Sequence, residues 1–177
     1  LSEPLKVKIQ LNDAKSVHGG DINETFRIAT NEGYFFVKMN DAKRFPDMFA
    51  QEYAGLLELR AAGALPAPKP LAYGVAGGKA YLLMEFLQKG QAVPEFWEDF
   101  ARGLARQHRV SRPHFGYPGS NYMGSIKQCN TPYSSWPVFY AFNRLGPLIR
   151  MAYDQQIVDK QMVQQWIAES RAKIDAA

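Results

Sequence analysis

Two charged residues lie where burial is expected, and they are the first candidates for chemistry in this sequence. Lys38 lies in the apolar run 35–39 (FFVKM), which has the aromatic and β-branched composition of a strand. Glu52 lies in the segment 46–62, which reads as a helix with one apolar face. That face carries Phe49, Glu52, Tyr53, Leu56 and Leu57. An ammonium or a carboxylate that is buried alone is unfavourable, so we expect these two charges to pair.

The expected pair of Lys38 and Glu52 has a functional and a structural interpretation. In enzymes that transfer phosphoryl groups, a glutamate can hold a lysine so that the ammonium contacts nucleotide phosphates. Alternatively, the two residues form an ordinary ion pair, or Lys38 lies at a sheet edge and extends its ammonium into water. These two residues alone leave both interpretations open.

A turn with two glycines precedes Lys38 in the chain. Its residues are Gly19, Gly20, Asp21, Ile22 and Asn23. A glycine pair lets backbone N–H groups approach a phosphate closely, because no side chain intervenes. The same composition also suits any hairpin turn. The order of glycine turn, strand lysine and helix glutamate is the one that the nucleotide-binding lobe of a kinase requires, and it favours the phosphate-binding interpretation.

The segment 81–87 (YLLMEFL) is a candidate for adenine binding. A buried strand that runs into a boundary between lobes could pair its backbone with the edge of an adenine ring, with Met84 at the back of the pocket. The residues of this candidate hinge are Met84, Glu85, Phe86 and Leu87. An ordinary core strand would have the same composition.

The predicted elements divide the chain into two parts. Strands are expected at 5–10, 25–30, 34–40, 71–76 and 79–87, and helices at 46–62, 94–110, 137–153 and 158–175. The last two strands would be joined at Gly77-Gly78, and Gly63 would end the first helix. Strands with one inserted helix, followed by helices alone, indicate an α+β fold with two lobes. We expect one lobe at 1–89 and a partial helical lobe at 90–177.

Size and composition limit the classes of protein. The 177 residues are enough for one domain, or for one small lobe and part of another. With 46% hydrophobic and 21% charged residues the chain is typical of a soluble protein, and no apolar run is long enough to cross a membrane. The one cysteine excludes an internal disulfide and, with no secretory signal, favours the cytoplasm. The net charge of +4 is scattered, so no nucleic-acid partner is expected.

Longer stretches of the sequence resemble the fructosamine kinase (ketosamine-3-kinase) family, a branch of the protein-kinase-like fold related to aminoglycoside phosphotransferases and choline kinases. The first lobe contributes GGDINETFRI, YFFVKMN, MFAQEYAGLLELRAAG, LPAPKPLAYG and YLLMEFL. Three later motifs separate this branch from other kinases. They are Phe115-Gly116-Tyr117, the G-x-x-x-Q-x-N stretch Gly124 to Asn130, and the W-x-x-F-Y-x-x-x-R stretch Trp136 to Arg144.

The resemblance implies a fold, an activity and roles for residues. The fold would be protein-kinase-like, with a five-stranded antiparallel first lobe containing one helix, and the first helices of the second lobe. The activity would be ATP-dependent phosphorylation of ketosamines, which are fructose- or ribulose-type sugars on a small amine or a protein lysine, and it would serve to repair glycation. Gly19 to Asn23 would cover the phosphates, Lys38 and Glu52 would bind them as a pair, and Met84 to Leu87 would form the adenine hinge. The stretch 121–130 could face the acceptor sugar or form a solvated loop.

The sequence departs from the family where the reaction itself would take place. The catalytic loop H-G-D-L-W-x-G-N is absent, as is the later Asp that holds Mg²⁺, so no catalytic or metal-binding residue is assigned in this chain. His108-Arg109-Val110 is a poor substitute, because a valine cannot accept a proton, and His108 is expected to belong to a helix. We therefore expect an inactive fragment of a ketosamine kinase. The alternatives are a nucleotide-binding module without catalysis, or an aminoglycoside- or choline-kinase-like phosphotransferase.

Overall fold

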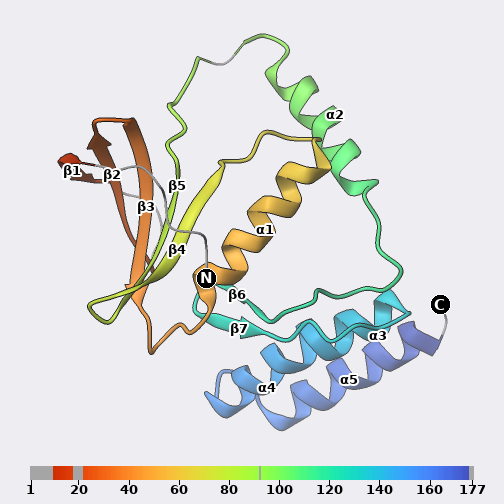
Figure 1. Cartoon of the computed structure of the whole chain (residues 1–177). Helices are drawn as coiled ribbons and strands as arrows, with labels where there is room; N and C mark the ends of the chain where they lie inside the picture. Colours follow the sequence, from red (N-terminus) through yellow and green to blue (C-terminus); the bar gives the residue numbers. More distant parts are fainter. Residues whose placement is uncertain (1–9, 18–21, 92, 176–177) are drawn as a thin grey trace. The chain divides into compact units, whose positions relative to one another are not determined.

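The chain divides after Ser111 into two compact units. The computed structural model describes residues 10–17, 22–91 and 93–175 (Figure 1). The predicted boundary between the lobes lies earlier, between residues 89 and 90. The first compact unit therefore also contains the helix that follows this boundary. The functional division into 1–89 and 90–177 stays a prediction. In the described ranges, no helix combines the length and apolar character needed to cross a membrane.

A five-stranded antiparallel sheet forms the first unit, with the strand order β1-β2-β3-β5-β4 (Figure 1). The strands are β1 (Leu11–Ser16), β2 (Glu24–Thr30), β3 (Gly33–Asp41), β4 (Pro70–Ala76) and β5 (Lys79–Glu85). The last four confirm the predicted strands to within two residues at each end. Gly77 and Gly78 join β4 to β5 with φ angles of 56° and 80°, as a tight hairpin turn with two left-handed residues requires.

The first strand differs from its prediction. Of the predicted strand at 5–10, residues 5–9 lie outside the described part of the chain, and Gln10 is not in a strand. Instead, β1 comprises the polar sequence LNDAKS, and all six of its residues are exposed. It pairs only along β2, as an edge strand, and the polar side chains suit a strand with one unprotected edge.

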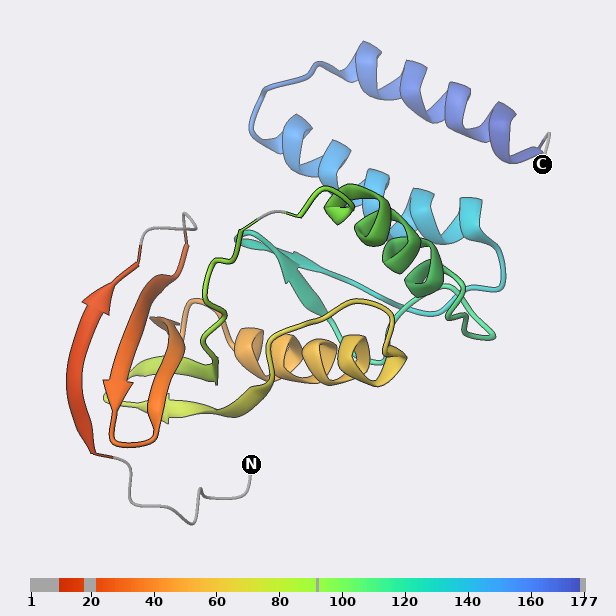
Figure 2. The ribbon, with the colours of Figure 1, turned by 90° about the horizontal axis from the view of Figure 1, so that it is seen from above.

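Helix α1 (Met48–Ala62) packs against β4 and β5. Its first turn is anchored by the buried Met48 and Phe49, and Tyr53 lies 5.0 Å from the ring of Tyr73 in β4. At its far end Gly63 adopts a φ of 61° and donates its N–H to the carbonyl of Arg60, which confirms the predicted cap. Figure 2 shows α1 beside the sheet, as a cover for part of one face.

The strand register brings one set of side chains to the face that α1 covers. Lys38 lies opposite Thr25 on β2 and opposite Leu82 on β5. Since side chains alternate along a strand, Phe36 and Asn40 point to the same face as Lys38. Their partners on β5 there are Ala80, Leu82 and Met84, all of which are buried. This face is the core of the first unit.

Helix α2 (Phe96–His108) confirms the helix predicted at 94–110. Phe96, Phe100 and Leu104 form an apolar stripe along this helix, and all three are exposed. Phe96 and Phe100 stack on each other with their ring centroids 6.3 Å apart, and each is 43% exposed. The buried contact of α2 is made instead by Gly103, which lies against Ala64 and Leu65. His108 ends the helix and is exposed.

The second unit contains a short hairpin and a set of helices. They are β6 (Asn121–Met123), β7 (Ile126–Gln128), α3 (Trp136–Tyr140), the π-helix η1 (Ala141–Leu145), α4 (Gly146–Asp154) and α5 (Lys160–Asp175). The segments α3, η1 and α4 follow one another without a break, and α5 runs beside this run in both views (Figures 1 and 2). The helices confirm the predictions at 137–153 and 158–175, whereas the hairpin was read as loop.

Arg144, in the π-helix, ties two of the sequence motifs together. Its Nη2 donates to Oδ1 of the buried Asn130 over 2.6 Å, and its Nη1 donates to the carbonyl of Cys129 over 2.9 Å. The guanidinium also lies 4.8 Å from the ring centre of Phe139. The last residue of the W-x-x-F-Y-x-x-x-R stretch therefore binds the last residue of the G-x-x-x-Q-x-N stretch.

Gly116, in the Phe-Gly-Tyr motif, allows a first stability test. Its φ is 145°, and a Cβ there would lie 2.7 Å from the carbonyl oxygen of Asn130 and 3.0 Å from Cα of Pro132. Because both obstacles are backbone atoms, Gly116→Ala should destabilise the second unit by at least about 1–3 kcal/mol. Gly55→Ala is the control, because a Cβ in the middle of α1 meets no described atom within 4 Å, and it should raise stability by about 0.5–1 kcal/mol. Urea denaturation of both variants checks the opposite signs.

Asp41, at the end of β3, should give stability a dependence on acid pH. The N–H groups of Arg44 and Lys43 donate to its Oδ1, and they hold the pKa of this carboxyl below its ordinary value of 3.8. A lowered folded pKa means that the stabilisation is complete above the ordinary value and is lost as the pH falls through the folded value. Asp41→Asn should therefore melt below the unmodified chain near neutral pH, and the gap should close under acid. A gap that stays constant throughout a pH series of melting curves would contradict this.

Candidate functional site

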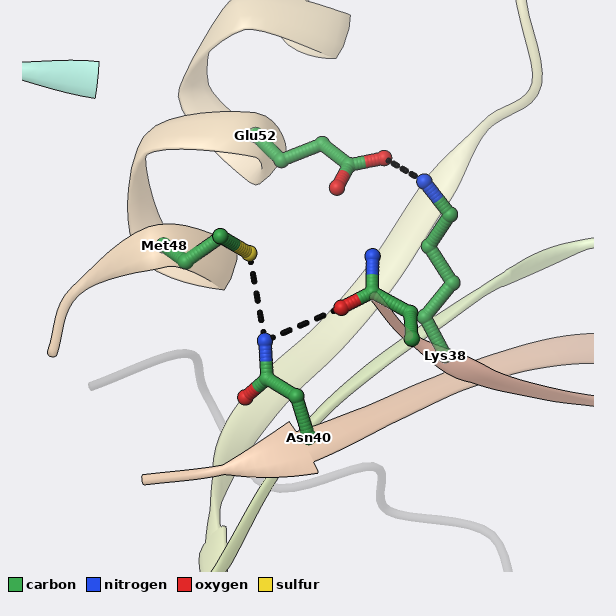
Figure 3. Close-up of polar contacts among 5 residues, drawn as sticks. Lys38, Asn40, Met48 and Glu52 are labelled. Atoms are coloured by element: carbon green, nitrogen blue, oxygen red, sulfur yellow. Dashed lines mark hydrogen bonds and ion pairs between the residues drawn. The ribbon is translucent and has the colours of Figure 1, made fainter. Parts of the chain in front are cut away.

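The predicted ion pair between Lys38 and Glu52 is confirmed. Nζ of Lys38 on β3 lies 2.6 Å from Oε1 of Glu52 on α1, as Figure 3 shows. The two side chains are 27% and 30% exposed, so the pair is neither fully buried nor free in solvent. An anion approaching from solvent can therefore reach the ammonium.

The local sequence explains why these two groups meet. Met48 and Phe49 bury the first turn of α1 against the sheet, and Glu52 follows Met48 by four residues, which places both on the same side of the helix. On β3, Lys38 lies on the sheet face that α1 covers. Both charges are thus brought together by the periodicity of the elements that carry them.

The glycine turn is only partly described. Gly19, Gly20 and Asp21 lie outside the described residues, whereas Ile22 and Asn23 are described and half-buried. On either side of the turn, the N–H of Val17 donates to the carbonyl of Thr25 over 2.9 Å, and the hydroxyl of Thr25 donates to the carbonyl of Val17. The chain entering the turn and the chain leaving it are therefore held together at Val17 and Thr25. A role of residues 19–23 over phosphates stays a prediction.

Asn40 belongs to this site, although the sequence analysis did not select it. It lies two residues after Lys38, is only 3% exposed, and donates from Nδ2 to Oδ1 of Asn23 over 3.1 Å. The same nitrogen lies 3.1 Å from the sulfur of Met48. Strand alternation could have identified it, because any residue two positions from Lys38 shares its face.

The four residues of the candidate hinge have different environments. Met84 is 5% exposed and lies opposite Phe36, while Glu85 is the last residue of β5. The N–H of Glu85 donates to the carbonyl of Lys69 over 2.9 Å, and its carboxylate accepts the N–H of Lys69 over 3.0 Å. Phe86 is half-buried and Leu87 is 55% exposed. The adenine-binding role of these residues stays a prediction.

A second cluster missed by the sequence analysis lies beside Phe86. The ring of Phe86 is 6.3 Å from that of Tyr34, and the guanidinium of Arg27 lies 4.9 Å from the centre of Tyr34 and 5.9 Å from that of Phe86. A guanidinium near an aromatic face is favourable. The cluster connects β2, β3 and the residue after β5. No period in the sequence joins these three segments, so only the structure could identify it.

A groove lies elsewhere, within the second unit. This groove of about 890 Å³ is bounded by η1, α4 and α5, and apolar side chains dominate its lining. They include Phe142, Leu145, Ile149, Trp166 and Ile167. Arg150 and Arg171 also line the groove. None of the residues predicted to bind nucleotide is among its lining residues.

Comparisons with known proteins show what this chain is similar to. The profile of the family described as fructosamine kinase matches residues 1–176. A probable ketoamine kinase of Synechocystis sp. is 30% identical over 153 residues, which cover 86% of this chain and 52% of that protein. A chloroplastic protein-ribulosamine 3-kinase of Arabidopsis thaliana is 35% identical over 149 residues, covering 82% and 45%. The chain thus spans about half the length of these relatives.

Solved structures confirm the fold. A provisionally named fructosamine-3-kinase of Thermobifida fusca superposes with a TM-score of 0.82 at 26% identity, over 94% of this chain and 58% of that one. Another, from Haemophilus somnus, superposes with a TM-score of 0.78 at 24% identity, over 85% and 51%, and is a likeness of fold alone. The predicted α+β, protein-kinase-like fold is therefore confirmed. With nearly every residue matched by the family profile, the chain belongs to the fructosamine kinase family.

Proposed function

We propose that these residues form the nucleotide-binding part of an ATP-dependent ketosamine kinase. Membership of the family and the names of the relatives support a kinase that acts on ketoamines or ribulosamines. The observation that carries the proposal for this chain is the contact of 2.6 Å between Lys38 and Glu52. The substrates would be fructosamines or ribulosamines, on small amines or on glycated protein lysines, in the cytoplasm.

In the proposed site, Lys38 would bind the phosphate and Glu52 would orient Lys38. The ammonium of Lys38 has three donors, and Oε1 of Glu52 takes one of them, which fixes the direction of the others. A phosphate oxygen that meets this oriented ammonium gains a charge-assisted hydrogen bond. The backbone of Gly19 to Asn23 would add N–H donors over the same phosphates, because glycines permit a close approach.

The hinge residues would hold the adenine. The buried Met84 suits the inner wall, because its side chain is apolar and adaptable. The N–H of Glu85 already donates to Lys69, so the donor to the adenine edge must come from Phe86 or Leu87. ATP would supply the phosphoryl group, and the Mg²⁺ that accompanies it is not assigned to any residue of this sequence.

Nucleotide binding by this chain is the first test. Lys38→Ala should weaken the binding of a non-hydrolysable ATP analogue by at least about tenfold, because a charge-assisted contact is lost. The matched control is Lys79→Ala. Lys79 also lies 2.6 Å from a glutamate, Glu24, but strand alternation places it on the opposite face of the sheet. Isothermal titration calorimetry should find unchanged affinity for Lys79→Ala. Equal losses in both variants would remove Lys38 from the site.

Turnover is the second test, and it separates the candidate activities. The printed sequence lacks the H-G-D-L-W-x-G-N loop, so the 177-residue chain should bind ATP without phosphorylating any acceptor. A full-length protein containing it should phosphorylate ribulosamines or fructosamines with ATP and Mg²⁺, as followed by ADP release and mass spectrometry of the acceptor. Activity on an aminoglycoside or choline alone would move the assignment to that branch. Binding without turnover in the full-length protein would favour a non-catalytic module.

A further inference from the structure

The side-chain amide of Asn40 connects three elements of the proposed nucleotide site. Asn40 lies on β3 with Lys38, its Nδ2 donates to Oδ1 of Asn23 at the end of the glycine turn, and the same nitrogen contacts Sδ of Met48 (Figure 3). Met48 opens α1, one turn before Glu52. Through Met48, Asn40 contacts the helix that carries Glu52. Through Asn23, it contacts the end of the turn that is proposed to cover the phosphates.

With the amide of Asn23 placed as it is, these neighbours determine the orientation of the Asn40 amide. If its oxygen and nitrogen were exchanged, Oδ1 of Asn40 would face Oδ1 of Asn23 and the sulfur of Met48. Both of those atoms are acceptors, so the exchanged orientation would lose its hydrogen bonds. The donor of Asn40 is consequently directed at Asn23.

Asn40 is a poor choice if its purpose is stability alone. Its Oδ1 is buried and has no hydrogen-bond partner within the described part of the chain. A buried acceptor without a partner is unfavourable, and a thioether is a weak acceptor for the amide donor. A leucine of similar size would fill the same space among Ala80, Met48 and the sheet without this penalty. The presence of a buried amide whose oxygen has no described partner therefore needs an explanation other than packing.

We propose that Asn40 is a positioning residue, which holds Asn23 at a fixed place relative to the ammonium of Lys38. The inference rests on the proposed function, because it assigns a purpose to that site. Two residues along a strand separate the Cα atoms of Lys38 and Asn40 by roughly 6–7 Å. One strand thus carries both the ammonium proposed to bind phosphate and the amide that contacts Asn23. Preorganisation of this kind improves affinity because less freedom is lost on binding.

The test compares Asn40→Leu with Thr30→Val in the 177-residue chain. Thr30 is also buried and also donates a side-chain hydrogen bond, to the carbonyl of Gly33, but at the other end of the β2–β3 hairpin. Asn40→Leu should keep the melting temperature while weakening the binding of the ATP analogue by about 3- to 10-fold. Hydrogen exchange at the amides of 22–24 should become faster. Thr30→Val should change neither the affinity nor the exchange at 22–24.

A second variant tests the same contact if Asn40→Leu does not fold. Asn23→Ala removes the acceptor at a half-buried position, and it should lower affinity by a similar factor. Adding Asn40→Leu to it should then have little further effect, because both changes break one contact.

The outcomes distinguish this inference from the proposed function. If the unmodified chain binds the analogue and Asn40→Leu binds it equally well, the positioning role is overturned and the proposed function stands. The role is also overturned if affinity falls only in parallel with the melting temperature, as a purely structural residue would require. An unmodified chain that does not bind the nucleotide overturns both proposals.

Discussion

The rest of the site depends on the ion pair between Lys38 and Glu52. With side-chain exposures of 27% and 30%, such a pair contributes little to stability, since partly exposed ion pairs are worth about 0–1 kcal/mol. Its effect is geometric. It links β3 to α1, and it leaves one ammonium oriented at the border between core and solvent. Breaking either partner would leave a half-buried charge uncompensated, so the two residues constrain each other more strongly than they stabilise the fold.

Local periodicity made most of the first unit predictable. Lys38 and Glu52 could be paired from sequence because each is a charge among apolar neighbours, Lys38 in the run 35–39 and Glu52 next to Tyr53 and three residues from Phe49 on a helix. Gly63 and the pair Gly77-Gly78 were equally readable, since each occupies a backbone conformation that favours glycine. The pattern gave the face of Lys38 but not its distance from Glu52, which depends on how α1 packs against β4 and β5.

Where periodicity was absent, the predictions missed or misplaced elements. Strand β1 has no apolar alternation, because both of its faces are exposed and its place depends on backbone pairing with β2. The strands β6 and β7 have three residues each, too few to establish a period. The π-helix η1 carries no sequence signature of its own, yet it contains the Arg144 that binds Asn130. The contact of Arg144 with Asn130 joins segments that are 14 residues apart, and the pattern within one segment cannot contain it.

The contrast between the two units shows why volume is a weak guide to this site. The groove of the second unit is lined mainly by aromatic and aliphatic side chains, and none of the residues predicted to bind nucleotide is among them. A triphosphate is recognised by hydrogen-bond donors and positive charge, and in the proposed site two residues of β3 would serve this purpose. Lys38 would present the charge, and Asn40 would hold Asn23 through one amide hydrogen bond. In this unit the polar groups that interrupt the apolar face therefore mark the site, and the apolar residues around them serve to keep those groups in register.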